Sequence, residues 1–192
     1  VVVPAANVVP VPDGVSAAAA AAVQPLAGAI HAHAVAAVRP GESVLVVGAG
    51  VMGLLAVQVA RHGNAGPILV AGRSRAKLEL AARFGADLVL GAGDDVPAGV
   101  AAATEGIGVD VVIETAGGAP SVGLSGAGTL DLAVRCVRRG GRIVLVSVLP
   151  EGAPAPLARL RERGVSLLHP RSGVGAFEHA LRLVARGDVD VE

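Results

Sequence analysis

Residues 44–53 read VLVVGAGVMG, and this stretch decides the fold. Four apolar residues run directly into a G-x-G-x-x-G pattern formed by Gly48, Gly50 and Gly53. The apolar run is typical of a buried strand, and residues 51–62 carry apolar side chains at helical spacing. A strand, a glycine turn and a helix in this order are the fingerprint of a dinucleotide-binding βαβ unit.

Each glycine of the fingerprint meets a separate steric demand. Gly48 permits the tight turn, Gly50 lets a pyrophosphate approach the backbone, and Gly53 lets the helix lie close to the strand. The helix N-terminus then offers free N–H groups and a partial positive charge to the phosphates. The alternative is a tight strand–helix turn that binds nothing, so the flanking elements must support the motif.

The rest of the chain alternates short apolar stretches with helical patterns. We expect strands at 43–47, 67–71, 87–90, 109–114, 142–148 and 164–168. We expect helices at 51–62, 75–84, 129–139 and 174–186. This alternation predicts an α/β fold with a doubly wound parallel sheet of the Rossmann type, covered by helices on both faces.

Two segments depart from this alternation. The alanine-rich stretch 16–38 predicts helix ahead of the first strand, with a break or a helix N-terminus near Pro25. The Gly/Ser-rich segment 117–128 predicts a loop or a loosely formed helix start.

The composition excludes several classes of partner. The 16 basic and 16 acidic residues give zero formal net charge, which argues against nucleic acid and anionic membranes. Glycines and polar residues interrupt the apolar stretches 15–38 and 43–60, so neither predicts a membrane span. Cys136 is the single cysteine and fits a cytoplasmic location. Because the chain starts without Met or a basic signal-peptide region, we expect a piece of a longer protein.

The end of the second expected strand indicates which nicotinamide cofactor is bound. Folds that bind NAD place an acid there, roughly 20 residues past the glycine turn, for the ribose hydroxyl. Here Gly72, Arg73, Ser74 and Arg75 occupy the position. Guanidinium groups pair with a 2′-phosphate that an acid would repel, so the sequence indicates NADP(H). The alternative is that the arginines are solvated surface charges and Ser74 is an N-cap.

Two other nucleotide-binding classes fit less well. SAM-dependent methyltransferases normally use an acid at the same position for their ribose, and none is present. Short-chain dehydrogenases need a catalytic tyrosine, and this chain contains no tyrosine.

Several motifs in combination point to one family. They are QPL at 24–26, HAHAVAAVRPGESVLVVGAGVMGLLAVQVAR at 31–61, KLELAARFGAD at 77–87, VDVVIETAGG at 109–118 and RRGGRIVLVSV at 138–148. With these motifs the chain resembles the medium-chain dehydrogenase/reductase family, and most closely its zinc-type alcohol, sorbitol and threonine dehydrogenase branch.

The resemblance implies a cofactor site, residue by residue. The pyrophosphate would lie against Gly48, Gly50, Val51, Met52 and Gly53. The adenosine ribose would lie among Gly72, Arg73, Ser74 and Arg75, with Lys77 nearby. The groove would continue along Thr115, Ala116 and Gly117 to a nicotinamide near Ser147 and Val148, with His169 in the same region.

The resemblance also implies zinc in the full-length protein. Members of this branch place a glutamate before Pro-Leu at or beside the catalytic zinc, and here that residue is Gln24. An amide is a weaker zinc ligand than a carboxylate, so Gln24 is a weak catalytic candidate and we predict no metal ligand in this chain. His31 and His33 are two residues apart and would point to different helix faces, which argues against a zinc pair.

The resemblance implies a division of the chain and a reaction. Residues 1–40 would be a crossover segment from a catalytic domain outside this chain, and 41–192 the dinucleotide-binding domain. The parent would be an NADP(H)-dependent oxidoreductase that transfers hydride between the cofactor and an alcohol or carbonyl substrate, as a homodimer or higher oligomer. The fragment alone would be inactive. The alternatives are a non-catalytic NADP(H)-binding module and a zinc-free member similar to quinone or enoyl reductases.

Overall fold

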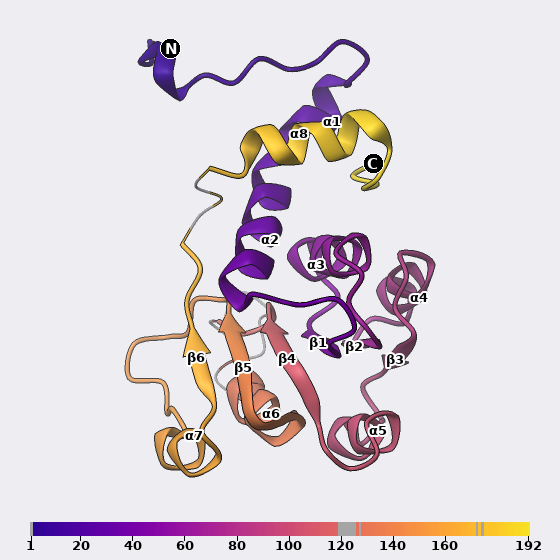
Figure 1. The fold of residues 1–192 in the computed structure, drawn as a ribbon, viewed down its shortest axis with the longest axis vertical. Helices are drawn as coiled ribbons and strands as arrows, with labels where there is room; N and C mark the ends of the chain where they lie inside the picture. The colour runs from indigo at the N-terminus through magenta and orange to yellow at the C-terminus, as the bar shows by residue number, and fades with distance from the viewer. Residues whose placement is uncertain (1, 119–125, 127, 172, 174) are drawn as a thin grey trace.

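The computed structural model describes residues 2–118, 126, 128–171, 173 and 175–192. Six parallel strands form one sheet in the order β3-β2-β1-β4-β5-β6 (Figure 1). The strands are β1 (Val44–Val47), β2 (Ile68–Ala71), β3 (Leu88–Leu90), β4 (Val109–Glu114), β5 (Val137–Leu145) and β6 (Ser166–Leu168). This is the strand order of the dinucleotide-binding Rossmann fold, so the predicted fold class is confirmed.

Helices connect the strands and precede the sheet. They are α1 (Ala17–Ala21), α2 (Val23–Ala36), α3 (Val51–His62), α4 (Arg75–Arg83), α5 (Val96–Ala103), α6 (Gly128–Cys136), α7 (Leu157–Arg163) and α8 (Phe177–Arg186), with a 3-10 turn η1 (Ala5–Asn7). Helix α3 has the predicted bounds. The break near Pro25 is also confirmed, because α1 and α2 meet at Ala22 and Pro25 lies in the first turn of α2.

The helix predictions differ from the structure at three helices, α5, α6 and α7. Helices α5 and α7 were not predicted; they have eight and seven residues, too few for a clear helical period. The predicted helix 129–139 ends early, at Cys136, because Val137 already pairs with Val109 of β4. The expected loop 117–128 falls largely on residues 119–125 and 127, outside the described residues.

The central strands are buried on both faces. Val44 and Val46 of β1 pack in one cluster with Val57 of α3, while Leu45 and Val47 pack in another with residues of α5, α6 and α7. Figure 1 shows α3 and α4 on one side of the strands and α5, α6 and α7 on the other. A strand covered on both sides needs a continuous apolar run, and VLVV is such a run.

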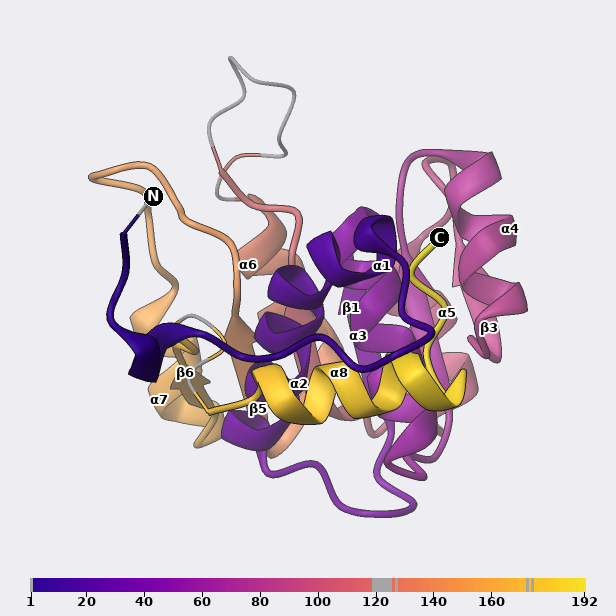
Figure 2. The ribbon, with the colours of Figure 1, turned by 90° about the horizontal axis from the view of Figure 1, so that it is seen from above.

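A third apolar cluster joins α2 and α8 to α3, and Figure 2 shows α8 lying across α2. The Gln58 side chain links the backbone of Asp190, near the C-terminus, to α3 by two hydrogen bonds. Its amide nitrogen donates to the Asp190 carbonyl at 2.9 Å, and its oxygen accepts from the Asp190 N–H at 2.8 Å. No helix in the described part of the chain is both long and apolar enough to cross a bilayer.

Asp110 holds the starts of three neighbouring strands together. One carboxylate oxygen accepts from the N–H and the hydroxyl of Ser43, both at 2.8 Å, and the other lies 2.6 Å from Nε of Arg138. Burial raises the pKa of Asp110, but the bonds from Arg138 and Ser43 outweigh it, and the pKa lies below its ordinary value. Folding therefore favours the ionised carboxylate.

We expect Asp110→Asn to lower the free energy of unfolding by about 1–3 kcal/mol at neutral pH, the usual loss for bonds to a charged group. Because the folded-state pKa lies below the unfolded value of about 3.9, the carboxylate stabilises the fold above that pH and loses its effect as pH falls. The deficit of the variant should therefore shrink below about pH 4. Urea denaturation at pH 7 and at pH 3.5 measures both values.

Asp131→Asn is the matched control. The Arg159–Asp131 pair is 2.7 Å long, but its side chains are about half exposed. A surface pair of this kind contributes about 0–1 kcal/mol. Equal losses in the two variants would contradict the role assigned to Asp110.

Candidate cofactor-binding site

A groove of about 680 Å³ opens along the carboxyl edge of the sheet. Its lining comes mainly from residues that directly follow β1, β2, β3 and β4: Gly48–Gly50, Gly72–Ser74, Gly91, Ala92, Asp94, Thr115 and Ala116, together with Lys77 and with Gly128, Thr129 and Leu132 of α6. The chain order reverses between β1 and β4, and ligands of open α/β sheets bind at this switch point.

The three glycines of the fingerprint differ in what surrounds them. A Cβ on Gly53 would lie 1.8 Å from the Gly48 carbonyl oxygen, and a Cβ on Gly48 would lie 2.7 Å from Oγ1 of Thr115. A Cβ on Gly50 would meet no heavy atom of the described residues within 4 Å, apart from its chain neighbours. The packing of the described residues therefore requires Gly48 and Gly53 to be glycine, whereas it leaves open space at Gly50.

Backbone and side-chain bonds hold the turn rigid. Gly48 has φ +107°, a conformation that glycine adopts without strain. The Thr115 hydroxyl donates to the carbonyls of Val47 at 3.0 Å and Gly48 at 3.2 Å. The groove wall after β4 is thus bonded directly to the turn after β1.

Helix α3 offers positive potential to this groove. The first N–H groups of a helix have no partner within the helix, and the first turn of α3, all of it described, carries no acid. The side chain of Val51 is 64% exposed beside the turn. Met52 points elsewhere: its Cε would lie 3.3 Å from a Cβ on Gly28, so it faces α2.

The groove end after β2 carries the basic side chains. Arg73, Ser74 and Lys77 line it, and Gly72 packs closely on Ala49 and Leu78. Ser74 occupies the N-cap position of α4, but its side chain makes no capping hydrogen bond. Arg75 lies outside the lining, with its Nε 3.0 Å from the Glu79 carboxylate on the exposed side of the helix. The structure thus brings Arg73 and Lys77 to the groove, and Arg75 to a surface ion pair.

The loop after β3 lines the same end of the groove with Gly91, Ala92 and Asp94. These residues were not predicted from the sequence. The Asp94 carboxylate accepts from the Gly91 N–H at 2.6 Å, which folds residues 91–94 into a tight turn. The position of this loop in the sequence could have indicated it, because every loop that follows a parallel strand lies at the same edge of the sheet.

The ends of β4 and β5 carry Gly117, Ser147 and Val148, and none of these three predicted residues lines the groove. Val148 is 85% exposed, and a Cβ on Gly117 would lie 2.5 Å from Oγ of Ser147. The Ser147 hydroxyl donates to the carboxylate of Glu114, which is fully buried at the end of β4. Glu114 was also missed, although an acid that ends an apolar strand is a visible signal.

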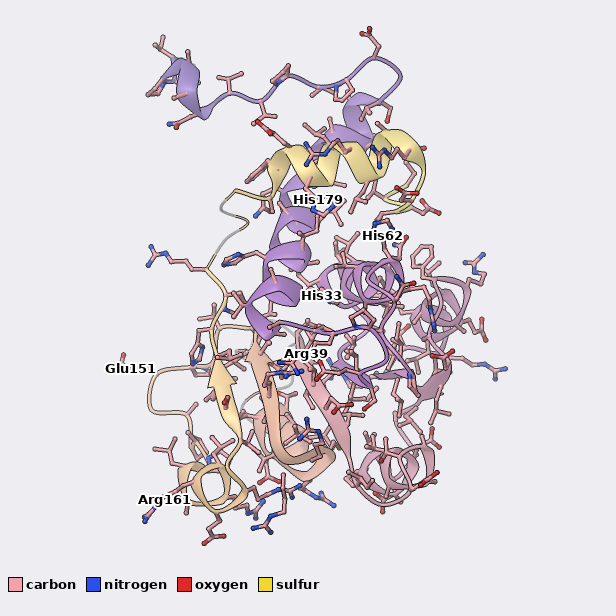
Figure 3. All side chains as sticks on the ribbon, viewed as in Figure 1. His33, Arg39, His62, Glu151, Arg161 and His179 are labelled. Carbon is pink, nitrogen blue, oxygen red and sulfur yellow. The ribbon has the colours of Figure 1, made fainter. Side chains whose placement is uncertain are left out.

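The residues considered for zinc do not gather. Gln24 is exposed in the first turn of α2, one turn before Gly28. Figure 3 shows His33, His62 and His179 on three different helices. Burial lowers the pKa of His33. Among the described residues no group of three His, Cys, Asp or Glu could hold a metal ion, so these residues do not fit a zinc site.

Cys136 is a core residue. It is buried in the cluster beneath α6, and burial raises the pKa of its thiol to about 11. The thiol therefore stays protonated at neutral pH and is a poor nucleophile or metal ligand.

Residues 50–186 match the family model described as zinc-binding dehydrogenase. The chain belongs to the zinc-binding dehydrogenase family. The match begins inside the glycine turn and runs to the end of α8, so it covers all of the groove lining except Val47, Gly48 and Ala49. It confirms the resemblance to the zinc-type branch. The chain is similar to the cofactor-binding portion of zinc-type dehydrogenases.

Curated members of the family are about twice as long as this chain. A protein of Agrobacterium fabrum that carries the name "Putative D-xylulose reductase" is 31% identical over 193 residues, which cover 100% of this chain and 53% of that protein. The L-threonine 3-dehydrogenase of Pyrococcus horikoshii is 38% identical over 111 residues, 57% of this chain and 30% of that one. The chain thus spans about half the length of the first of these relatives.

Solved structures of dehydrogenases have the same fold. Alcohol dehydrogenase TADH from Thermus sp. ATN1 superposes with a TM-score of 0.83 and 32% identity, over 94% of this chain and 52% of that one. A structure described as a zinc-binding dehydrogenase of Sinorhizobium meliloti 1021 bound to NADP superposes with a TM-score of 0.84 and 29% identity. The superposition covers 94% of this chain and 52% of that one. A structure described as a short chain alcohol dehydrogenase from Escherichia coli CFT073 complexed with NADH superposes with a TM-score of 0.82 and 27% identity. The superposition covers 98% of this chain and 53% of that one.

We expect Gly53→Ala and Gly50→Ala to affect stability very differently. Gly53→Ala should lower the free energy of unfolding by about 1–3 kcal/mol or more, because the new methyl group meets a backbone oxygen that cannot move away. Gly50→Ala should change it by less than about 0.5 kcal/mol, because Gly50 has φ −79° and open space above it. Denaturant titration of both variants tests this contrast, and a large loss in Gly50→Ala would contradict it.

Proposed function

We propose that this chain holds NADP(H) for an oxidoreductase that transfers hydride between the nicotinamide and an alcohol or carbonyl substrate. The observation that carries the proposal is the open backbone above Gly50, at the switch point of the sheet, facing the N-terminus of α3. A pyrophosphate would fill this space and accept hydrogen bonds from the first amides of the helix. The nicotinamide, when bound, supplies the hydride.

The charges after β2 support NADP(H) over NAD(H). Arg73 and Lys77 line the groove where the adenosine ribose would lie, and no acid occupies the turn 72–75. A 2′-phosphate would pair with these cations, and the Ser74 hydroxyl could donate to it. The neighbours described above hold NADP in one case and NADH in another, so the fold is compatible with either cofactor. The preference for NADP(H) over NAD(H) therefore depends on the side chains after β2.

The rest of the proposal concerns the whole protein. Residues 1–40 would connect residues 41–192 to a substrate-binding domain that supplies any zinc, with Gln24 near the junction. The relatives named for D-xylulose and L-threonine support a small alcohol or carbonyl substrate. The short edge strand β6 would pair with a second copy to form a homodimer or a higher oligomer. The single, buried cysteine supports a cytoplasmic location.

Side-by-side calorimetric titration with NADPH and NADH tests the cofactor proposal. We expect NADPH to bind about 10–100-fold more tightly, the effect of one or two charge-assisted hydrogen bonds to the 2′-phosphate. Arg73→Ala should reduce this ratio by about tenfold and leave NADH binding nearly unchanged. Arg83→Ala removes the same charge at the far end of α4 and should leave the ratio unchanged. NADH binding as tight as NADPH binding would contradict the choice of cofactor.

Gly50→Ala tests the proposed position of the pyrophosphate. The added methyl group would occupy the space into which the phosphates must come, so we expect NADPH affinity to fall about tenfold or more. Calorimetry of this variant, with its unfolding curve as the control for folding, measures the effect. Unchanged NADPH affinity in a folded Gly50→Ala variant would remove the main support for the proposal.

A further inference from the structure

A second pocket, which we call the arginine pocket, lies at the amino edge of the sheet, opposite the cofactor groove. It has a volume of about 650 Å³ and is lined by Gly106, Ile107, Arg138, Arg139 and Arg163. The first two residues come from the turn before β4, the next two from the start of β5, and the last residue ends α7. Figure 1 shows the starts of β4 and β5 at the end of the molecule away from α1 and α8.

Two reciprocal hydrogen bonds hold α7 against the start of β5. A terminal nitrogen of Arg139 donates to the carbonyl of Glu162 at 3.1 Å, and a terminal nitrogen of Arg163 donates to the carbonyl of Val137. Each bond fixes a guanidinium group at the pocket wall. A backbone carbonyl carries only a partial negative charge, so neither bond neutralises the arginine that makes it.

Among the described residues, a single carboxylate pairs with the three arginines. Arg138 pairs with Asp110, with 2.6 Å between its Nε and a carboxylate oxygen. In the part of the chain that the structure describes, no carboxylate oxygen lies within 4.0 Å of a guanidinium nitrogen of Arg139 or Arg163. Two positive charges in the pocket wall are therefore without a paired acid.

The arginines also carry more N–H donors than the described residues satisfy. Arg138 uses its Nε for Asp110 and its Nη1 for the Arg139 carbonyl at 2.8 Å, whereas Arg139 and Arg163 each use one Nη2. Nε of Arg163 is buried and has no hydrogen-bond partner among the described residues. A buried donor without a partner is rare and indicates a water molecule or an ion as the acceptor.

The charge and the donors of the pocket match a phosphate group. Arginine suits phosphate because its planar fork donates two parallel hydrogen bonds to an oxyanion. A phosphate monoester carries a charge of about −1.5 to −2 at neutral pH and presents three acceptor oxygens around one phosphorus atom. The acids beside the lining in sequence, Glu105 and Glu162, are exposed and lie outside the lining. They therefore do not occupy the space that an anion would fill.

We propose that the arginine pocket binds the phosphate group of a small phosphorylated molecule. The charges of Arg139 and Arg163 attract the dianion, and the terminal nitrogens of the guanidinium groups donate to its oxygens. Ile107 is 65% exposed in the lining, and its side chain offers apolar surface to the organic part of the ligand. Because this site and the cofactor groove lie at opposite edges of the sheet, the two sites bind independently.

Proton–nitrogen NMR spectra of the 192-residue chain locate the bound anion. The probes are inorganic phosphate, phenyl phosphate and succinate, added at constant ionic strength because salt screens exposed charges. The amide signals of Gly106, Ile107 and Arg139 report on the arginine pocket, and those of Gly50 and Gly72 report on the cofactor groove. No cofactor is added, so the result does not depend on the proposed function.

We expect phosphate to shift the signals of the arginine pocket with a dissociation constant on the order of 1 mM, the affinity of two or three charge-assisted hydrogen bonds at an open site. Phenyl phosphate should bind about threefold to tenfold more tightly, because its ring covers Ile107. Succinate carries its two charges at opposite ends. It should bind about tenfold more weakly than phosphate, because neither carboxylate can accept from all three arginines.

Arg139→Ala should weaken phosphate binding about tenfold, the loss of one charge-assisted hydrogen bond. Arg163→Lys keeps the charge, loses the planar fork and should weaken phosphate binding as well. Arg161→Ala is the matched control, because it removes the same charge from α7 outside the lining, where Figure 3 shows the side chain pointing away from the sheet. It should change the affinity by less than about twofold, because water and salt screen an exposed charge.

Four results would overturn the proposal. They are shifts confined to the amides of the cofactor groove, no shift up to about 20 mM phosphate, succinate binding as tight as phosphate binding, and equal effects of Arg139→Ala and Arg161→Ala. If the spectrum of Arg139→Ala shows an unfolded chain, the comparison of Arg163→Lys with Arg161→Ala decides.

Discussion

The close approach of α3 to the end of β1 is the constraint on which the rest of the structure depends. A Cβ on Gly53 would lie 1.8 Å from the carbonyl oxygen of Gly48, so the helix and the turn after the strand are in direct backbone contact. Thr115 bonds the same turn to β4, and the two halves of the sheet meet there. Because helix and strand leave each other no space at this junction, the position of Gly50 and of the open space above it is determined by packing within the chain.

The two edges of the sheet are built differently. At the amino edge, Asp110 joins Ser43 and Arg138, so the polar groups are bonded to one another. At the carboxyl edge, the described first turns of α3 and α4 contain no acid, and Arg73 and Lys77 line the groove. Asp94 lines the same end, where its carboxylate accepts from the Gly91 N–H. The acid that ends β4, Glu114, is buried and bonded to three donors, so it does not face a bound phosphate.

Much of the fold could be predicted from short-range patterns. The apolar run VLVV, the glycine spacing and the helical period of 51–62 are local signals, and in combination they indicate a strand, a tight turn and a helix. The two unpredicted helices, α5 and α7, are short. Their buried apolar residues, Val100 and Leu160, pack against one face of the sheet, a contact that no local pattern shows. The early end of α6 has the same origin, because pairing with Val109 draws Val137 into β5. Long-range pairing therefore overrode local helical preference at this point.

By itself, the sequence determined the parallel α/β class, the glycine turn and the basic character of the turn 72–75, because these depend on spacing and residue type. Only the tertiary structure decided which basic side chains face the groove. Arg73 and Lys77 do, whereas the first turn of α4 carries Arg75 away to Glu79. The link between Glu114 and Ser147, 33 residues apart, was also beyond the sequence. It exists because β4 and β5 are neighbours in the sheet, and strand order is a property of the folded chain.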